Sequence, residues 1–128
     1  MMRILAFVAF FLGASLAAAM PPKSEIEALL AYMKGLDGAV FIRNGSEHTA
    51  GEAEAHLRLK WNRQSEKIAT AEDFIALCGS KSSMSGERYQ IRFKNGDVRF
   101  SDDVLTAQLK AVRGTPPAHA GQPPPSAE

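Results

Sequence analysis

The sequence is poor in cysteine, and this limits what can hold the fold together. Cys78 is the only cysteine among 128 residues, so no intramolecular disulfide can form. Hydrophobic packing must therefore stabilise the fold without covalent help. Ala71, Phe74, Ile75 and Cys78 follow helical spacing. A thiol on such an apolar face is typical of a core cysteine, since reactive thiols need an electropositive, accessible setting.

An excess of either charge is also missing. Lysine and arginine number 15 and aspartate and glutamate 14, and without Arg3 the two signs balance at 14 each. A general nucleic-acid-binding protein needs a basic excess to neutralise phosphates. We therefore expect no nucleic-acid partner.

The common catalytic and metal-binding motifs are absent. The chain has no G-x-S-x-G elbow, no S-x-x-K, no H-E-x-x-H and no glycine spacing of a phosphate loop. His48, Glu52 and His56 are evenly spaced, but His48 precedes the predicted helix. We expect no metal site and no cofactor.

One long apolar run is present, at the start of the chain. Arg3 precedes an apolar stretch, Ile4 to Leu16, and small residues follow at 17–19, the pattern of an export signal cleaved near Ala19. The stretch is too short to span a bilayer, and no second one follows. We expect a periplasmic or secreted protein without a stable membrane anchor.

Two further segments follow the predicted signal. Residues 20–114 have the length and apolar content of a single globular domain. Residues 115–128 contain five prolines and no large apolar side chain, so we expect a disordered proline-rich tail.

The apolar periodicity of the domain predicts an α+β fold, mostly helical, with about four helices. Helices are expected at 24–34, 49–64, 70–78 and 101–114. Ser24 with Glu27 and Thr49 with Glu52 have the spacing of capping boxes, and Thr70 is a third N-cap candidate. An apolar run at 39–42 fits a buried strand, and Asn44-Gly45 turns the chain after it. Together with a later hairpin, this run predicts a two- or three-stranded sheet.

The hairpin is signalled by alternation around Asn95-Gly96. A two-residue turn there would place Arg92 opposite Arg99 and Ile91 opposite Phe100. Facing arginines destabilise a strand pair unless an anion lies between them. Two explanations stay open: a local carboxylate from Asp102, Asp103 or Glu87, or an acidic partner docking on the basic side chains Arg88, Arg92, Lys94 and Arg99.

A block of motifs runs through the domain: Phe-Ile-Arg-Asn-Gly at 41–45, His56-Leu57 with Lys60, Thr-Ala-Glu-Asp-Phe-Ile at 70–75, and Ser-Lys-Ser-Ser-Met-Ser-Gly at 80–86. This block resembles the bacterial domain-of-unknown-function family 5329, the YfeK-like exported proteins, over roughly Glu25 to Leu109. The resemblance implies export and a common fold, and it implies no activity. Some family members carry a cysteine just before the first motif, where this chain has Gly38 and Ala39.

The second helix carries the candidate site. On a helical wheel, Glu54, Arg58 and Asn62 share the expected solvent face, with apolar edges at Leu57 and Trp61 and at Ala55 and Leu59. The arc between those edges holds Glu52, His56, Lys60 and Arg63. Buried charge needs partners, so an inward histidine and lysine are unusual.

Three explanations of this arc follow. His56 can be a hydrogen-bonded core histidine, with Lys60 extending to water. Alternatively, His56 and Lys60 bind an anionic small ligand together with Arg43, Asn44, Ser82, Ser83 and Ser85. Third, Ser82, Ser83 or Ser85 of the serine-rich loop at 80–86 is a nucleophile, with His48 or His56 as its base and Glu47, Glu52 or Glu72 orienting that base. We expect a non-enzymatic binding or interaction module of the cell envelope, whose partner is an anionic ligand or an envelope protein, with a small periplasmic hydrolase as the alternative.

Overall fold

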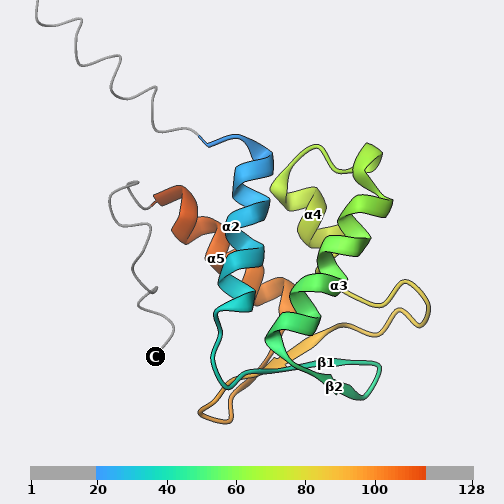
Figure 1. Ribbon diagram of the computed structural model, residues 1–128, viewed down its shortest axis with the longest axis vertical. Helices are drawn as coiled ribbons and strands as arrows, with labels where there is room; N and C mark the ends of the chain where they lie inside the picture. The colour runs from blue at the N-terminus through green and yellow to red at the C-terminus, as the bar shows by residue number, and fades with distance from the viewer. Residues whose placement is uncertain (1–19, 115–128) are drawn as a thin grey trace, which may run out of the picture.

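The computed structural model describes residues 20–114, which form four α-helices and one antiparallel sheet in strand order β2-β1-β3-β4. The elements are α2 (Pro22–Lys34), β1 (Val40–Arg43), β2 (Ser46–His48), α3 (Ala50–Arg63), the 3-10 helix η2 (Ser65–Lys67), α4 (Ala71–Leu77), β3 (Gln90–Arg92), β4 (Val98–Phe100) and α5 (Ser101–Gly114). The helices gather on one side of the sheet (Figure 1). The predicted α+β class is confirmed. The predicted signal at 1–19 and tail at 115–128 lie outside the described residues.

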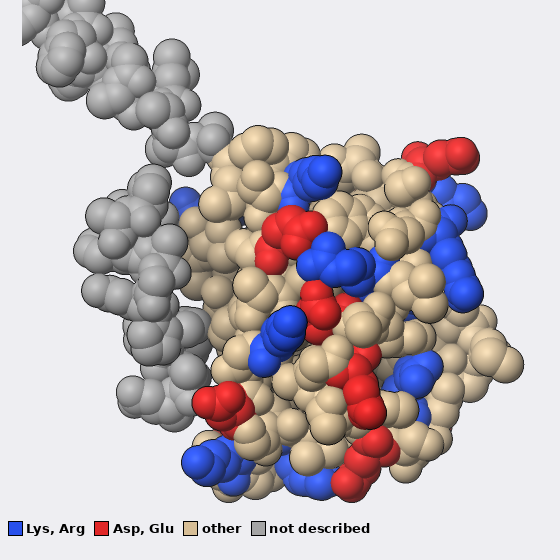
Figure 2. Space-filling model, viewed as in Figure 1, with Lys and Arg blue, Asp and Glu red and all other residues tan. Residues whose placement is uncertain are grey.

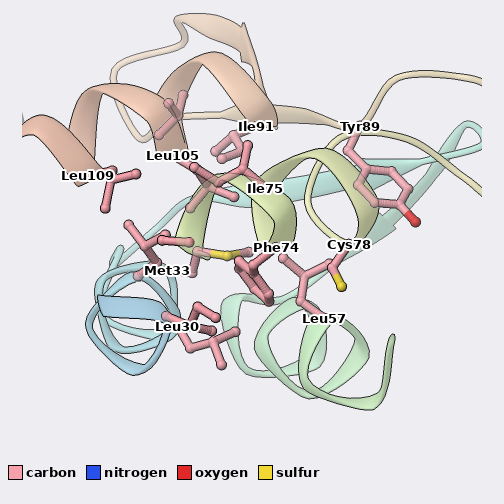
Figure 3. Packing of buried hydrophobic residues seen from close by; sticks show 14 of the residues in the cluster. Leu30, Met33, Leu57, Phe74, Ile75, Cys78, Tyr89, Ile91, Leu105 and Leu109 are labelled. Carbon is pink, nitrogen blue, oxygen red and sulfur yellow. The ribbon is translucent and has the colours of Figure 1, made fainter. Parts of the chain in front are cut away.

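A single hydrophobic cluster lies between the sheet and the helices (Figure 3). Its buried members come from every α-helix and from β3, and include Leu29, Leu30, Leu57, Phe74, Ile91 and Leu105. Cys78 belongs to this cluster and is fully buried, which raises the pKa of its thiol to about 11. The predicted core role of this cysteine is confirmed. No helix in residues 20–114 is both long enough and apolar enough to cross a membrane.

Two of the three predicted N-terminal helix caps are confirmed. Thr49 and Glu52 form a reciprocal capping box before α3, and Thr70 forms one with Asp73 before α4. The predicted box of Ser24 and Glu27 is wrong. Helix α2 begins two residues earlier, at Pro22, where a missing backbone N–H costs nothing.

The sheet has four strands, not the two or three expected. The extra strand, β2, was missed because Ser46-Glu47-His48 has little of the β-branched or apolar character of strands. A tight turn after β1 brings these residues into pairing with β1. Asn44 and Gly45 both adopt positive φ, 53° and 77°, the geometry of a type I′ turn, and Arg43 then pairs with Ser46.

The predicted register of the later hairpin is wrong by one residue. Ile91 lies opposite Arg99, and Arg92 lies opposite Val98. The loop contains three residues rather than two, because the N–H of Phe93 donates to the carbonyl of Asp97 at 2.8 Å. Gly96 takes the positive φ of 98° that ends such a loop. Arg92 and Arg99 therefore do not face each other.

Candidate functional site

The buried side of α3 differs from the predicted wheel. Leu57 and Lys60 are its buried residues, whereas His56 is half-buried and Glu52 and Arg63 are exposed. The apolar edge expected at Ala55 and Leu59 is wrong, since both residues are exposed. The helix contacts α2 more than the sheet, which turns this edge toward solvent.

The predicted solvent face of α3 is occupied by ion pairs. Arg58 lies 2.9 Å from carboxylate oxygens of both Glu27 on α2 and Glu54 on its own helix. Figure 2 shows basic and acidic side chains interspersed over the face on which α2 and α3 lie. The charges on this face therefore compensate one another.

Lys60 is the most deeply buried charge on α3, with 7% of its surface exposed. Its ammonium donates hydrogen bonds to the hydroxyl of Tyr89 and to the carbonyl of Lys81, both at 3.0 Å. The ammonium also lies 5.1 Å from the centre of the Tyr89 ring. All of these partners are neutral, so the ammonium is hydrogen-bonded but its charge is not neutralised.

Tyr89 joins this lysine to His56. Its hydroxyl lies 3.3 Å from Nε2 of His56, and its ring closes one end of the hydrophobic cluster (Figure 3). Tyr89 was not among the site residues predicted from the sequence. The signal was present, because strand alternation with Ile91 and Phe93 places Tyr89 on the inward face.

Arg43 completes the group from the end of β1. Its Nη1 lies 3.5 Å from both ring nitrogens of His56. Burial, together with the positive charges of Arg43, Lys60, His48 and Arg63, lowers the pKa of His56 to about 4. The imidazole is therefore neutral at pH 7 within a ring of basic side chains.

We call Arg43, His56, Lys60 and Tyr89 the basic cluster. Among the described residues, no carboxylate oxygen lies within 4 Å of Arg43 or Lys60. A region of uncompensated positive charge favours an anion.

The serine-rich segment at 80–86, which we call the serine loop, lies beside the basic cluster and is ordered by its own hydrogen bonds. The hydroxyl of Ser82, a buried residue, accepts N–H donors from the backbone of Met84 and Ser85 and from the side chain of Asn44. The Ser85 hydroxyl donates to Oδ1 of Asn44 at 2.5 Å. Ser83 is exposed. Asn44, Ser82 and Ser85 thus hold the loop against the β1–β2 turn.

The loop also touches the basic cluster through its backbone, since Lys60 bonds the carbonyl that precedes Ser82. The structure therefore brings together Arg43, Asn44, His56, Lys60, Ser82 and Ser85. No serine hydroxyl in residues 20–114 is hydrogen-bonded to a histidine. The nucleophile–base pair that a serine hydrolase requires is not formed there.

His48 is a second histidine with an unusual environment. Its Nε2 is enclosed without a hydrogen-bond partner, and its Nδ1 lies 3.7 Å from Glu52. Within residues 20–114, no three His, Cys, Asp or Glu side chains come close enough together to hold a metal ion.

Two basic residues of the later hairpin region, Arg88 and Arg92, have local ion-pair partners. Arg88 lies 2.8 Å from Asp102 and 3.8 Å from Asp103. Arg92 pairs with Glu47 of β2 at 3.0 Å, a contact that follows from the extra strand. These pairs reduce the positive charge that the hairpin offers to a partner.

A small cavity opens between α3 and the inner face of the sheet. Its volume is about 30 Å³, and Arg43 and His56 lie on its wall with the buried side chains of Met33, Phe41 and Leu57. A single water needs roughly 10–15 Å³ by this measure, so the cavity holds a group of only a few atoms.

The fold and site define a small α+β domain with a basic cluster beside an ordered serine loop. The chain belongs to a family of unknown function, DUF5329, whose match covers residues 20–113. It is 39% identical over 67 residues to the uncharacterized protein YfeK of Salmonella typhimurium. That match covers 52% of this chain and 56% of YfeK, so the chain spans just over half the length of this relative. No solved structure matches the chain.

Proposed function

We propose that this protein is a non-enzymatic binding module of the bacterial cell envelope that recognises an anionic group at the basic cluster. One observation carries the proposal: Arg43 contacts a neutral His56, Lys60 is linked to the same ring through Tyr89, and neither cation has a carboxylate partner within 4 Å among the described residues. Burying a charge beside neutral groups alone is costly. A bound anion would offset that cost.

Each residue has a distinct part in this proposal. Arg43 contacts the anion, because its half-buried side chain carries donors that suit carboxylate or phosphate oxygens. The buried ammonium of Lys60 attracts the anion electrostatically without reaching the surface. Neutral His56 accepts or donates one hydrogen bond. Asn44, Ser82 and Ser85 position the loop, and Ser83 offers a free exposed surface hydroxyl.

Location in the envelope is supported by the first 19 residues. They combine a basic start, an apolar stretch and a small-residue cleavage site. The protein would then reach the periplasm or the exterior. Recovering it from the periplasm, with a mass that lacks residues 1–19, tests this part. A full-length mass in the cytoplasm contradicts it.

To test anion binding, the exported protein is titrated with inorganic phosphate, and the backbone amide chemical shifts are measured by NMR. We expect shifts in residues 43–44, 56 and 81–85, at concentrations up to about 20 mM, where even millimolar affinity nearly saturates a site. Arg43→Gln should weaken binding at least about tenfold. Arg99→Gln is the matched control, because Arg99 is an exposed arginine of β4 and its loss changes the net charge equally. Equal effects of the two variants, or no shifts at all, refute the site.

A further inference from the structure

The cavity beside the basic cluster is lined by side chains of two chemical kinds. Met33, Phe41, Ala53 and Leu57 are apolar, whereas Arg43 and His56 carry nitrogen groups that can bond a ligand. Three of the four apolar residues are buried in the hydrophobic cluster. A ligand that fills this space would therefore need both a carbon-rich part and a polar or charged group.

The size of the cavity restricts the apolar part. At about 30 Å³ it exceeds the roughly 10–15 Å³ that one water requires, but it cannot enclose an aromatic ring or a sugar. Water is a poor occupant of the space against the apolar side chains, because a buried water needs two to four polar partners. An aliphatic group of a few carbons matches both the size and the lining.

The donors of Arg43 favour a carboxylate. Arg43 bonds His56 through Nη1, and its other N–H groups have no acceptor among the described residues. A guanidinium presents paired donors that match the two oxygens of a carboxylate. Glu52 also lines the cavity, but its Oε1 accepts the N–H of Thr49 at 3.0 Å and lies 3.7 Å from Nδ1 of His48. This carboxylate is therefore held at the helix start.

We infer that the basic cluster recognises a carboxylate that carries a short aliphatic group, with the carboxylate on Arg43 and the aliphatic part in the cavity against Leu57. The inference rests on the proposed anion site and narrows its ligand class. A free short-chain carboxylic acid and the last residue of a peptide ending in a small apolar side chain share this chemistry.

Titration with butyrate, acetate and phosphate tests the inference. Butyrate should bind the exported protein at least about fivefold more tightly than acetate, since each buried methylene contributes about 0.8 kcal/mol. Arg43→Gln should weaken all three anions. Ala53 lines the cavity, so Ala53→Leu fills space that the aliphatic part would occupy. It should remove the preference for butyrate and leave phosphate binding unchanged.

Ala55→Leu is the control for the Ala53 variant, because Ala55 is an exposed residue of the same helix. It should leave the preference intact. Magnetisation transfer between the butyrate methyl and the methyl groups of Leu57 in the unsubstituted protein tests the same placement without any variant. Butyrate binding no tighter than acetate, or no transfer to Leu57, overturns the inference.

These outcomes separate the inference from the proposed function. If phosphate and acetate bind through Arg43 but butyrate shows no preference, the anion site stands and the aliphatic part fails. If no anion binds, both fail. A peptide ending in valine, compared with its C-terminal amide, identifies the source: binding tighter than butyrate that is lost in the amide indicates a peptide terminus, and weaker binding indicates a free acid.

Discussion

His56 shows how one residue makes stability depend on pH. An ordinary histidine has a pKa of 6.5, whereas that of His56 is about 4 in the folded state. Between these values the unfolded chain takes up a proton that the folded chain does not, so stability falls as pH decreases from about 6.5 to about 4. The full difference corresponds to about 3 kcal/mol, and solvent screening of the half-exposed ring reduces the expected loss to about 1 kcal/mol.

Urea unfolding at pH 7 and pH 5 measures this loss. Carboxylates also titrate near the lower pH, so the informative quantity is the difference between the unsubstituted protein and His56→Gln. The variant should lose less stability on acidification. An equal loss in both proteins would show that His56 is not the group responsible.

Two glycines in neighbouring elements should respond to alanine in opposite directions. A methyl group at Gly45 or at Gly51 meets no atom within 4 Å, so space does not decide the outcome. Gly45 has a φ of 77° in the β1–β2 turn, and alanine there should cost about 1 kcal/mol. Gly51 lies in the first turn of α3, where alanine should add about 0.5 kcal/mol. Thermal unfolding of both variants measures this, and a shift of the same sign would contradict it.

The serine loop is an element ordered by one hydroxyl. Ser82→Ala removes the acceptor for three N–H donors, so we expect a loss of about 1 kcal/mol and faster amide exchange at Met84 and Ser85. Ser83→Ala is the control, because Ser83 is exposed, and it should change stability by less than about 0.5 kcal/mol. Equal amide exchange in the two variants would refute this role of Ser82.

Elements that follow from local chemistry could be predicted from the sequence. Thr49 and Thr70 mark helix starts because their hydroxyls bond nearby N–H groups. The register of the later hairpin could not be predicted, since Asn95-Gly96 is compatible with loops of two or three residues. Strand β2 depends on pairing with β1 rather than on its own composition. The failed Ser24 cap shows the same limit, because Glu27 pairs with Arg58 of another helix.

In the candidate site too, features set by local periodicity could be predicted, whereas features set by long-range contacts could not. Helical and strand periodicity placed His56, Lys60 and Tyr89 on inward faces, and the structure brings the three side chains together. Periodicity could not show that Ser82 would be buried by Asn44, because that bond joins residues 38 positions apart. The exposure of Ala55 and Leu59 depends on how α3 packs on α2, which a wheel does not contain.

The domain at 20–114 should unfold as one cooperative unit. Chemical labelling of the Cys78 thiol can measure that unfolding. Helices α2, α4 and α5 pack on one another, and Arg113 of α5 joins Glu25 of α2 to Glu72 of α4. The Cys78 thiol is fully buried with a pKa of about 11, so an alkylating reagent at pH 8 should react only after unfolding. Its labelling rate then follows the free energy of unfolding.

Leu105→Ala provides the test, because this fully buried side chain of α5 contributes to the same core as Cys78. The substitution should cost about 3 kcal/mol and speed labelling roughly a hundredfold, since each 1.4 kcal/mol is a factor of ten. Val98→Ala, at a residue that is half exposed on β4, should change the rate by less than about threefold. If Leu105→Ala labels no faster than the unsubstituted protein, the thiol is reached by a local movement of α4, and the helices do not open together.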